Sequence, residues 1–183
     1  AEVEAYEQRM GQFRDFAAED AAILEALALG EGSHILEIGT GSGHFARAAA
    51  RAGCRVAAVD VSEPMLQYAQ SRAKTEGLTG LEFHHAGFLT LNFQGETFDA
   101  AVSVVALHHL PDMWKAVALQ NIHRVLRPTG RFILRDVVFS WDGHAHAACF
   151  DAFVDSCPQD MRKHAARHIA AEYSTLDWVM RGL

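Results

Sequence analysis

The segment from residue 34 to 66 constrains the fold of this chain more than any other part of it. An apolar run, HILEI, leads into the glycine-rich loop GTGSG; a helix-forming run, HFARAAARA, follows, and a second apolar run ends at Asp60. Alternate glycines allow positive φ angles and a close approach of a ligand to the backbone, and the next helix turns its free N–H groups toward the same place. The segment therefore predicts a strand–loop–helix–strand unit that binds a nucleoside-like ligand.

Apolar and helix-forming runs alternate along the rest of the chain. Strands are expected at residues 34–38, 55–59, 81–85, 100–105 and 131–137. Helices are expected at about residues 3–29, 44–52, 64–76, 112–126 and from about 143 onward. This alternation predicts an α/β fold with a doubly wound, Rossmann-like, mostly parallel sheet and helices on both faces. Ligands of such sheets bind beyond the carboxyl ends of the strands.

The length of 183 residues fits a single domain, 1–183. Within it we expect an N-terminal helical cap at 1–30, a ligand-binding core at 34–137 and a substrate-side helical region at 138–183. The longest apolar run, 100–107, is far shorter than the ~20 residues of a membrane span, and the N-terminus AEVEAYEQRM is too polar for a signal peptide. Three cysteines without metal-ligand spacing fit reduced thiols, so we expect a cytoplasmic protein that does not bind membranes.

Two residues argue against a dinucleotide at the glycine loop. In the G-x-G-x-x-G pattern counted from Gly39, the sixth position is His44, which would crowd a pyrophosphate. Glu37, just before the loop, would repel a pyrophosphate but suits a cofactor with a positive charge. Asp60 lies about twenty residues beyond the loop, where an acid accepts hydrogen bonds from a ribose. An NAD-linked dehydrogenase stays open as a weaker alternative.

Four segments in order resemble the class I S-adenosylmethionine-dependent methyltransferases: LEIGTGSG, VDVSEPML, FDAAVSVVALHHLPD and VLRPTGRFILRD. The resemblance runs from about residue 34 to 136 and implies S-adenosylmethionine as the cofactor and methyl transfer as the activity. The cofactor-binding positions that it implies are Glu37, Gly39, Thr40, Gly41, Ser42, Gly43, Asp60, Val61, Met65, Gly87, Phe88 and Val104.

The resemblance also implies a role for each part of this set. The glycines would line the methionine and ribose of the cofactor, and Glu37 would sense its sulfonium and amino charge. Asp60 would bind both ribose hydroxyls, and Val61 and Met65 would flank the adenine. Val104 would offer a backbone contact to the amine.

One position departs from the family pattern. The family often has Asp where this chain has Gly87, followed by Phe88, so backbone groups are expected to replace that side-chain contact with adenine. Glycine-rich turns also occur in doubly wound proteins of other function, and Asp60 could merely cap the next helix. A nucleotide-binding module without catalysis therefore stays open as an alternative.

Methyl transfer is an in-line displacement, so a base is needed only when the acceptor must lose a proton. His108 is the candidate base, and the alternative is that it only lines the cleft. The expected acceptor-side residues are Tyr6, Phe16, His109, Arg135, Asp136, Trp141 and His144. Tyr6 and Phe16 would belong to an N-terminal helical lid, or else pack on the sheet edge. His109 could instead cap a helix, and Arg135 and Asp136 could make local ion pairs.

The acceptor is expected to be a small molecule. The loop VVALHHL lacks the Asn/Asp-Pro-Pro-aromatic run of enzymes that methylate exocyclic amines of bases, and Cys157 before Pro has the wrong order and place for a cytosine C5 nucleophile. A net charge of −7 also argues against a nucleic acid. The paired histidines, 144 with 146 and 164 with 168, lack a zinc-site context, so no metal is expected.

The family fold continues after the fifth strand with a helix and an antiparallel strand pair. HIAAEYSTLDWVMRGL resembles that helix, but no clear candidate for the strand pair follows it. We therefore expect residues to be missing at the ends, or around 157–166, and the C-terminal strand pair to be absent. An exposed sheet edge would also permit a homodimer.

Overall fold

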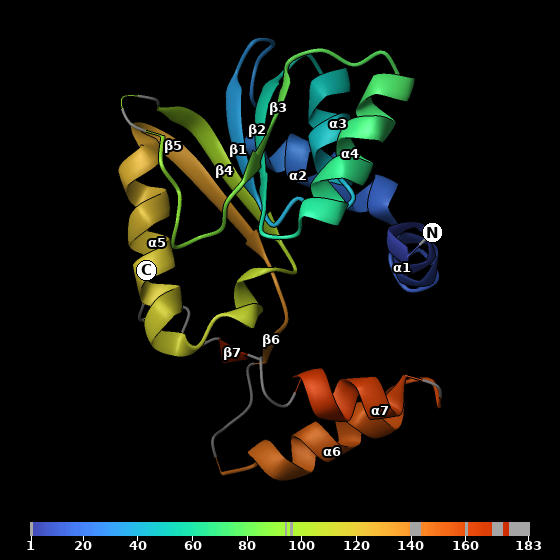
Figure 1. Ribbon diagram of the computed structural model, residues 1–183. Coiled ribbons are helices and arrows are strands. Elements are labelled where there is room, and N and C mark those ends of the chain that lie inside the picture. The colour runs from blue at the N-terminus through green and yellow to red at the C-terminus, as the bar shows by residue number, and fades with distance from the viewer. Residues whose placement is uncertain are drawn as a thin grey trace.

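Five parallel strands form the central sheet of the computed structural model (Figure 1), which describes residues 2–93, 95, 97–139, 144–159, 161–169 and 174–175. The strands are β1 (His34–Ile38), β2 (Arg55–Asp60), β3 (Leu81–His85), β4 (Phe98–Val104) and β5 (Leu126–Arg135). The helices that flank the sheet are α1 (Glu2–Met10), α2 (Phe16–Leu27), α3 (His44–Arg51), α4 (Glu63–Thr75) and α5 (Asp112–Val125), and a short 3₁₀ turn, η1 (Leu107–His109), precedes α5.

The strand order is β3-β2-β1-β4-β5, and every pairing in this sheet is parallel. From β1 the chain moves outward to β3, then returns to place β4 on the other side of β1. The carboxyl ends of β1 and β4 therefore form the topological switch point, where doubly wound sheets bind ligands. The predicted α/β doubly wound sheet is confirmed.

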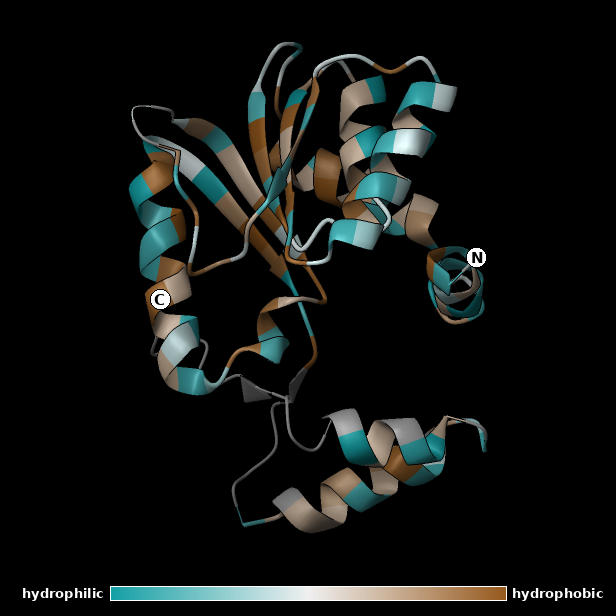
Figure 2. Ribbon diagram, viewed as in Figure 1, coloured by the Kyte–Doolittle hydropathy of each residue, from teal (hydrophilic) through white to brown (hydrophobic). Residues whose placement is uncertain are grey.

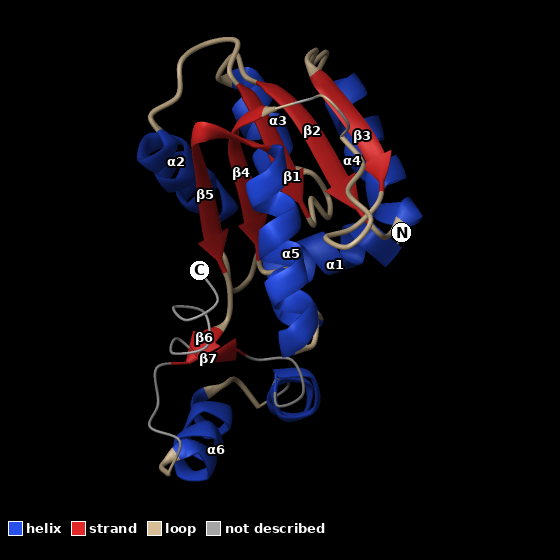
Figure 3. Cartoon of the chain, turned by 90° about the vertical axis from the view of Figure 1, so that its left-hand side faces the viewer, coloured by secondary structure: helices blue, strands red, loops and turns tan. Residues whose placement is uncertain are grey.

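Helices cover both faces of the sheet, with α2, α3 and α4 on one face and α5 on the other (Figures 1 and 3). Successive side chains of a strand point to opposite faces, so both sets must be apolar (Figure 2). Ile35 belongs to the core that includes Ile23 and Leu27 of α2, whereas its neighbour Leu36 belongs to the core that includes Ile122 of α5. Apolar packing on both faces holds the sheet, and with it the strand ends at which the site lies.

The N-terminal region differs from the single helix expected at 3–29. It forms two helices, because the chain turns at Gly11 and a new helix starts after Asp15, whose side chain accepts a hydrogen bond from the Ala18 N–H at 3.0 Å. An aspartate at this position is a strong helix start signal. The break lets α1 turn away from α2 and lie beside the carboxyl ends of the strands (Figure 3).

The start of β5 also differs from the prediction. Leu126 pairs with Phe98 and Arg131 pairs with Ala100, so the residues between Leu126 and Arg131 form a bulge within the strand. The strand therefore begins at Leu126 and not at residue 131, with an irregular start. Arg135 remains at the carboxyl end of β5, as the sequence indicates.

The C-terminal helices α6 (His146–Ser156) and α7 (Arg162–His164) lie beyond the carboxyl ends of the strands (Figure 1), and a π-helical turn, η2 (Ala165–Ile169), follows α7. Two short strands, β6 (Val138–Phe139) and β7 (Ser174–Thr175), pair in parallel. Among the described residues no antiparallel strand pair joins the central sheet. No helix in the described part of the chain is long and apolar enough to cross a membrane.

Helix α1 buries none of its residues, so its position depends on polar contacts made by Glu7. Glu7 Oε1 lies 2.7 Å from His44 Nε2 of α3, and the Tyr68 hydroxyl of α4 donates to Glu7 Oε2 at 2.7 Å. The His44 ring stacks on Phe16, with centroids 4.2 Å apart. Burial lowers the pKa of His44, although the neighbouring Glu7 acts in the opposite direction. Glu7 therefore joins α1 to two other helices at once.

The change Glu7→Gln should loosen α1 without unfolding the sheet. Burial acts to raise the pKa of Glu7, but the Tyr68 hydroxyl and then His44 lower it overall, so this stabilisation is present above the ordinary pKa of 4.5 and is lost as pH falls through the lowered value. A buried hydrogen bond to a charged group contributes about 1.5–3 kcal/mol to the free energy of unfolding. The low end of this range applies to Glu7, because the contact is partly exposed. We expect α1 amides to exchange roughly tenfold faster at pH 7, measured by hydrogen exchange.

The matched control is Glu4→Gln, an exposed acid of the same helix. It should leave the exchange rates unchanged. Equal rates in Glu7→Gln and the wild type would show that other contacts hold α1 in place.

Candidate functional site

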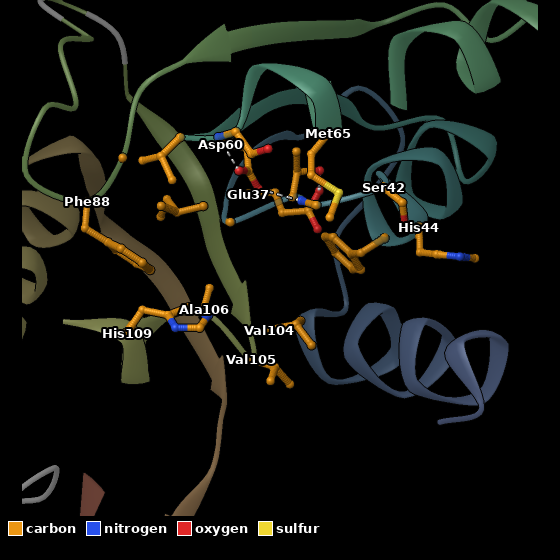
Figure 4. A pocket seen from close by; sticks show the side chains of 18 of the residues that line it. Glu37, Ser42, His44, Asp60, Met65, Phe88, Val104, Val105, Ala106 and His109 are labelled. Atoms are coloured by element: carbon orange, nitrogen blue, oxygen red, sulfur yellow. Dashed lines mark hydrogen bonds between the residues drawn. The ribbon is translucent and has the colours of Figure 1, made fainter. Parts of the chain in front are cut away.

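A cavity of about 530 Å³ opens at the carboxyl ends of the strands, at the switch point between β1 and β4. Most of the expected cofactor-binding residues line it: Glu37, Gly39, Thr40, Gly41, Ser42, Asp60, Val61, Met65, Gly87, Phe88 and Val104. Figure 4 shows Phe88 and His109 on one side of this cavity and Ser42 and His44 on the other. The structure thus brings four separate segments of the sequence, which follow β1, β2, β3 and β4, to one place.

At two positions of the loop a side chain would not fit, for a different steric reason at each. Gly39 has φ 79°, and a Cβ there would meet the Ala106 Cβ at 2.4 Å, so only glycine lets the loop after β1 contact the loop after β4. Gly43 has φ 76°, and its Cβ would meet the Ala69 Cβ of α4 at 2.7 Å. Unlike the other glycines of the loop, Gly43 is not among the residues that line the cavity. The absence of a side chain at Gly43 lets the start of α3 pack closely against α4.

Asp60 joins the end of β2 to the glycine loop. Its Oδ2 accepts from the Gly41 N–H at 2.7 Å, and its Oδ1 accepts from the Ser62 N–H at 2.8 Å. The residue is only 8% exposed and lines the cavity. Each carboxylate oxygen can accept a second hydrogen bond. Asp60 therefore holds the local backbone, while the N-cap of α4 is Ser62, and its oxygens can also accept from a ligand.

Glu37 is buried at the end of β1, where it is 3% exposed and borders the cavity. The Thr40 hydroxyl donates to its Oε2 at 2.6 Å. Burial raises the pKa of Glu37 to about 8, with Thr40 acting in the opposite direction and Asp20 and Asp60 adding to the rise. The carboxyl group is therefore largely protonated at pH 7. A positively charged ligand would favour its ionised form.

Val105 has an unusual backbone conformation next to the cavity. Its φ is 52°, which is a rare conformation for a β-branched residue. The Val105 N–H donates to the Arg135 carbonyl at 2.7 Å, which keeps the bend in place. Both Val104 and Val105 line the cavity (Figure 4). Strain of this kind persists where the surrounding structure fixes it, often at functional sites.

His108 lies in η1 and is held by Asp136. Its Nδ1 is 2.5 Å from Asp136 Oδ1, and its N–H donates to Asp136 Oδ2 at 3.0 Å. The side chains are 12% and 4% exposed. Neither is among the described residues that line the cavity, whereas the adjacent His109 is. The rings of His108 and His109 are 4.1 Å apart between centroids.

The other expected acceptor-side residues fall into two groups. Tyr6 and Phe16 line the cavity from the N-terminal helices. Arg135 and His144 do not: the Arg135 guanidinium lies 2.5 Å from Glu19 of α2, and His144 is exposed. Arg135 thus makes an ion pair, but with a residue distant in the sequence and not within its own loop. Trp141 lies outside the described residues.

Sequence reasoning placed Tyr6 and Phe16 of the N-terminal helices at the site but missed other residues of the cavity wall. Arg14 and Asp20 line it, as do Met10, Ala106 and Leu110. A helix of mixed polar and apolar residues does not reveal which of its charges faces a cavity, because that depends on how it packs. The start signal at Asp15 could have located the break between the helices, and with it Arg14. No group of three potential metal ligands occurs among the described residues.

Comparison with known proteins adds an independent line of evidence. A family model described as a methyltransferase domain matches residues 35–130, just over half of the chain. The 27-O-demethylrifamycin SV methyltransferase of Amycolatopsis mediterranei is 34% identical over 112 residues, which cover 60% of this chain and 40% of that protein. Several curated relatives are matched over a similarly small part of their length, because this chain spans only 38–40% of it.

Two solved structures extend the likeness to the fold. YcgJ of Bacillus subtilis has a TM-score of 0.74 at 23% identity, over 91% of this chain and 66% of that one. The N-methyltransferase NodS of Bradyrhizobium japonicum, solved with S-adenosyl-L-homocysteine, has a TM-score of 0.57 at 28% identity, over 66% and 62%. The family match spans the glycine loop, Asp60 and the loop after β4, so the sequence and the fold agree. The chain belongs to the methyltransferase domain family.

Proposed function

We propose that this chain binds S-adenosylmethionine in the cavity at the switch point and transfers its methyl group to a small-molecule acceptor. The observation that carries the proposal is the pair of buried acids at this cavity, Glu37 below the glycine loop and Asp60 at the end of β2. One acid suits a positive charge and the other suits a ribose diol. Together they fit a nucleoside with a cationic substituent better than they fit a pyrophosphate.

S-adenosylmethionine supplies an activated methyl group on a positively charged sulfur. The protein then has to position that group, since well-oriented reactants gain several kcal/mol from alignment alone, up to about 7–11. Asp60 would hold the ribose, and Gly87 and Phe88 would contact the adenine. Glu37 would face the positive charge, and Val104 and Val105 would border the reacting methyl. No covalent intermediate with the protein is needed.

The apolar side chains at the cavity support a small organic acceptor. Tyr6, Met10, Phe16 and Leu110 line the cavity alongside His109. The rifamycin relative acts on a small molecule by its name, which agrees with this class. The net charge of −7 also disfavours a nucleic acid as the acceptor.

We further propose a cytoplasmic location, based on the free cysteines of the described chain, and a homodimer formed through an exposed sheet edge.

The binding test is calorimetry with S-adenosylmethionine and its demethylated product, using Asp60→Asn and the control Glu63→Gln. Removing the carboxylate charge should weaken binding of both ligands at least tenfold, because a charged hydrogen bond contributes about 1.5–3 kcal/mol. Glu63 is exposed at the start of α4, and its replacement should have no effect. A thermal melt of each variant separates lost binding from lost folding. Binding of NADH in place of S-adenosylmethionine would favour the dehydrogenase alternative.

For an acceptor that must lose a proton, we propose His108 as the general base. Asp136 lies at its Nδ1 and would favour the tautomer whose basic lone pair is on Nε2. General-base help is worth ~10²–10⁴ in rate, so His108→Gln should lower turnover by that range while leaving cofactor affinity unchanged.

The measurement is the release of S-adenosylhomocysteine during incubation with a metabolite library, followed by kinetics on the acceptor found. Unaltered turnover in His108→Gln would leave alignment as the whole mechanism. Cofactor binding without product release on any acceptor would favour the non-catalytic alternative.

A further inference from the structure

A second hollow of the molecule, a groove of about 1050 Å³, lies between α2, α3 and the end of α4. These helices cover one face of the sheet (Figure 1). The turn between α1 and α2 closes the groove on one side. Of the described residues, none in the glycine loop and none in the segments after β2, β3 and β4 lines it. The groove is therefore distinct from the cavity at the switch point.

Three arginines line the groove from α3 and α4, and they share one acid, Glu76, which follows α4. Arg47 Nε lies 3.0 Å from Glu76 Oε1, and Arg51 Nη2 pairs with Glu76 Oε2. Arg72 makes no ion pair and no side-chain hydrogen bond within the described part of the chain. Positive charge thus exceeds negative charge on this side of the groove, although the net charge of the chain is −7.

The acids on the α2 side of the groove leave these arginine N–H groups unoccupied. Asp15 is engaged at the start of α2, where its side chain accepts from the Ala18 N–H at 3.0 Å. Asp20 lowers the excess positive charge, but it forms no ion pair or hydrogen bond with any described residue. The donors of Arg47 and Arg51 that do not reach Glu76 therefore remain available to a ligand.

Arg47 is the most buried of the three arginines. Its side chain is only 4% exposed, yet it lines the groove. Its Nη1 donates to the Ser42 carbonyl at 2.7 Å. Its Nε is in ion-pair range of Glu76 but forms no hydrogen bond within the described chain. A guanidinium has five N–H donors, and a buried charge is costly when its donors are not used. A bound anion would accept from the N–H groups that remain.

Apolar side chains continue the groove beside the arginines. Ala17, Ala21 and Leu24 of α2 line it together with Ala48 of α3. Phe13, in the turn before α2, also lines it and is 46% exposed. Small side chains on both helices leave room for carbon atoms of a ligand. The groove thus offers an apolar surface next to a cationic one.

We propose that this groove binds a small organic anion, with its phosphate or carboxylate group at Arg47, Arg51 and Arg72 and its apolar part along α2. The planar fork of a guanidinium matches the oxygen atoms of both anionic groups. A network of ion pairs without a ligand is the competing explanation. It accounts for Glu76 but not for Arg72 or for the unused donors of the buried Arg47. The proposal does not depend on the proposed function, because no residue of the reaction is involved.

The experiment is calorimetry with phenyl phosphate, at low ionic strength because salt screens exposed charges. The double variant Arg51→Gln/Arg72→Gln should bind phenyl phosphate about tenfold more weakly than the wild type. Both arginines are exposed, and a thermal melt verifies that the variant is folded. The control Arg55→Gln replaces an exposed arginine that does not line the groove, and it should bind like the wild type.

Inorganic phosphate tests the apolar part of the site. It carries the same anionic group without the ring, so it should bind more weakly than phenyl phosphate, because burial of apolar surface favours binding. Equal affinity for the two probes would contradict the proposed contact with α2. No binding of phenyl phosphate to the wild type, or equal binding to the double variant, would overturn the proposal as a whole.

A competition experiment separates the groove from the cavity, because Arg14, Phe16, Asp20 and His44 line both. The titration with phenyl phosphate is repeated in the presence of saturating S-adenosylhomocysteine. Binding should persist, since the arginines of the groove are not among the described residues that line the cavity, apart from Arg14. Complete loss of binding would place the anion in the cavity and contradict the proposal. The comparison of variants holds without this step, so a failure of the proposed function leaves the test intact.

Discussion

The carboxyl group of Glu37 is buried at the end of β1, between the glycine loop and the first residues of two other loops. Burial alone disfavours its charge, and Asp20 and Asp60 disfavour it further, so its pKa rises to about 8. A positively charged ligand would favour the ionised form of Glu37, and the described side chain that donates to its carboxyl group is the neutral hydroxyl of Thr40.

The loops around Glu37 are held by contacts that leave the cavity open. Asp60 fixes the glycine loop through Gly41, and Gly39 lets that loop touch Ala106 after β4. On the α1 side, Glu7 joins three helices through His44 and Tyr68. The histidine that argues against a pyrophosphate in the sequence therefore has a structural role in the N-terminal wall. The same contacts that shape the cavity also decide which charges face it.

Much of the fold could be predicted from the sequence, because the strands are buried on both faces and the turns carry clear glycine signals. Three of the five expected strands agree closely with β1, β2 and β3, and the glycine loop and Asp60 lie where the motif places them. The α1–α2 break was missed although Asp15 is a local helix start signal. The bulge at the start of β5 was missed because it depends on strand pairing more than on local propensity. Arg14 and Asp20 could not be assigned to the site, because nothing in a helical pattern fixes which face meets a cavity. Arg135 was expected at the acceptor, and its pairing with Glu19 depends on how α2 packs.

A crystal structure of the protein with S-adenosylhomocysteine bound tests the central claim most directly. The account predicts the ribose hydroxyls within hydrogen-bonding distance of the Asp60 carboxylate and the adenine between Val61 and Phe88. It also predicts the sulfur near Val104 and Val105, with Glu37 on the side of the amino group. A ligand bound outside this cavity, or one bound in it with the ribose away from Asp60, would contradict the account.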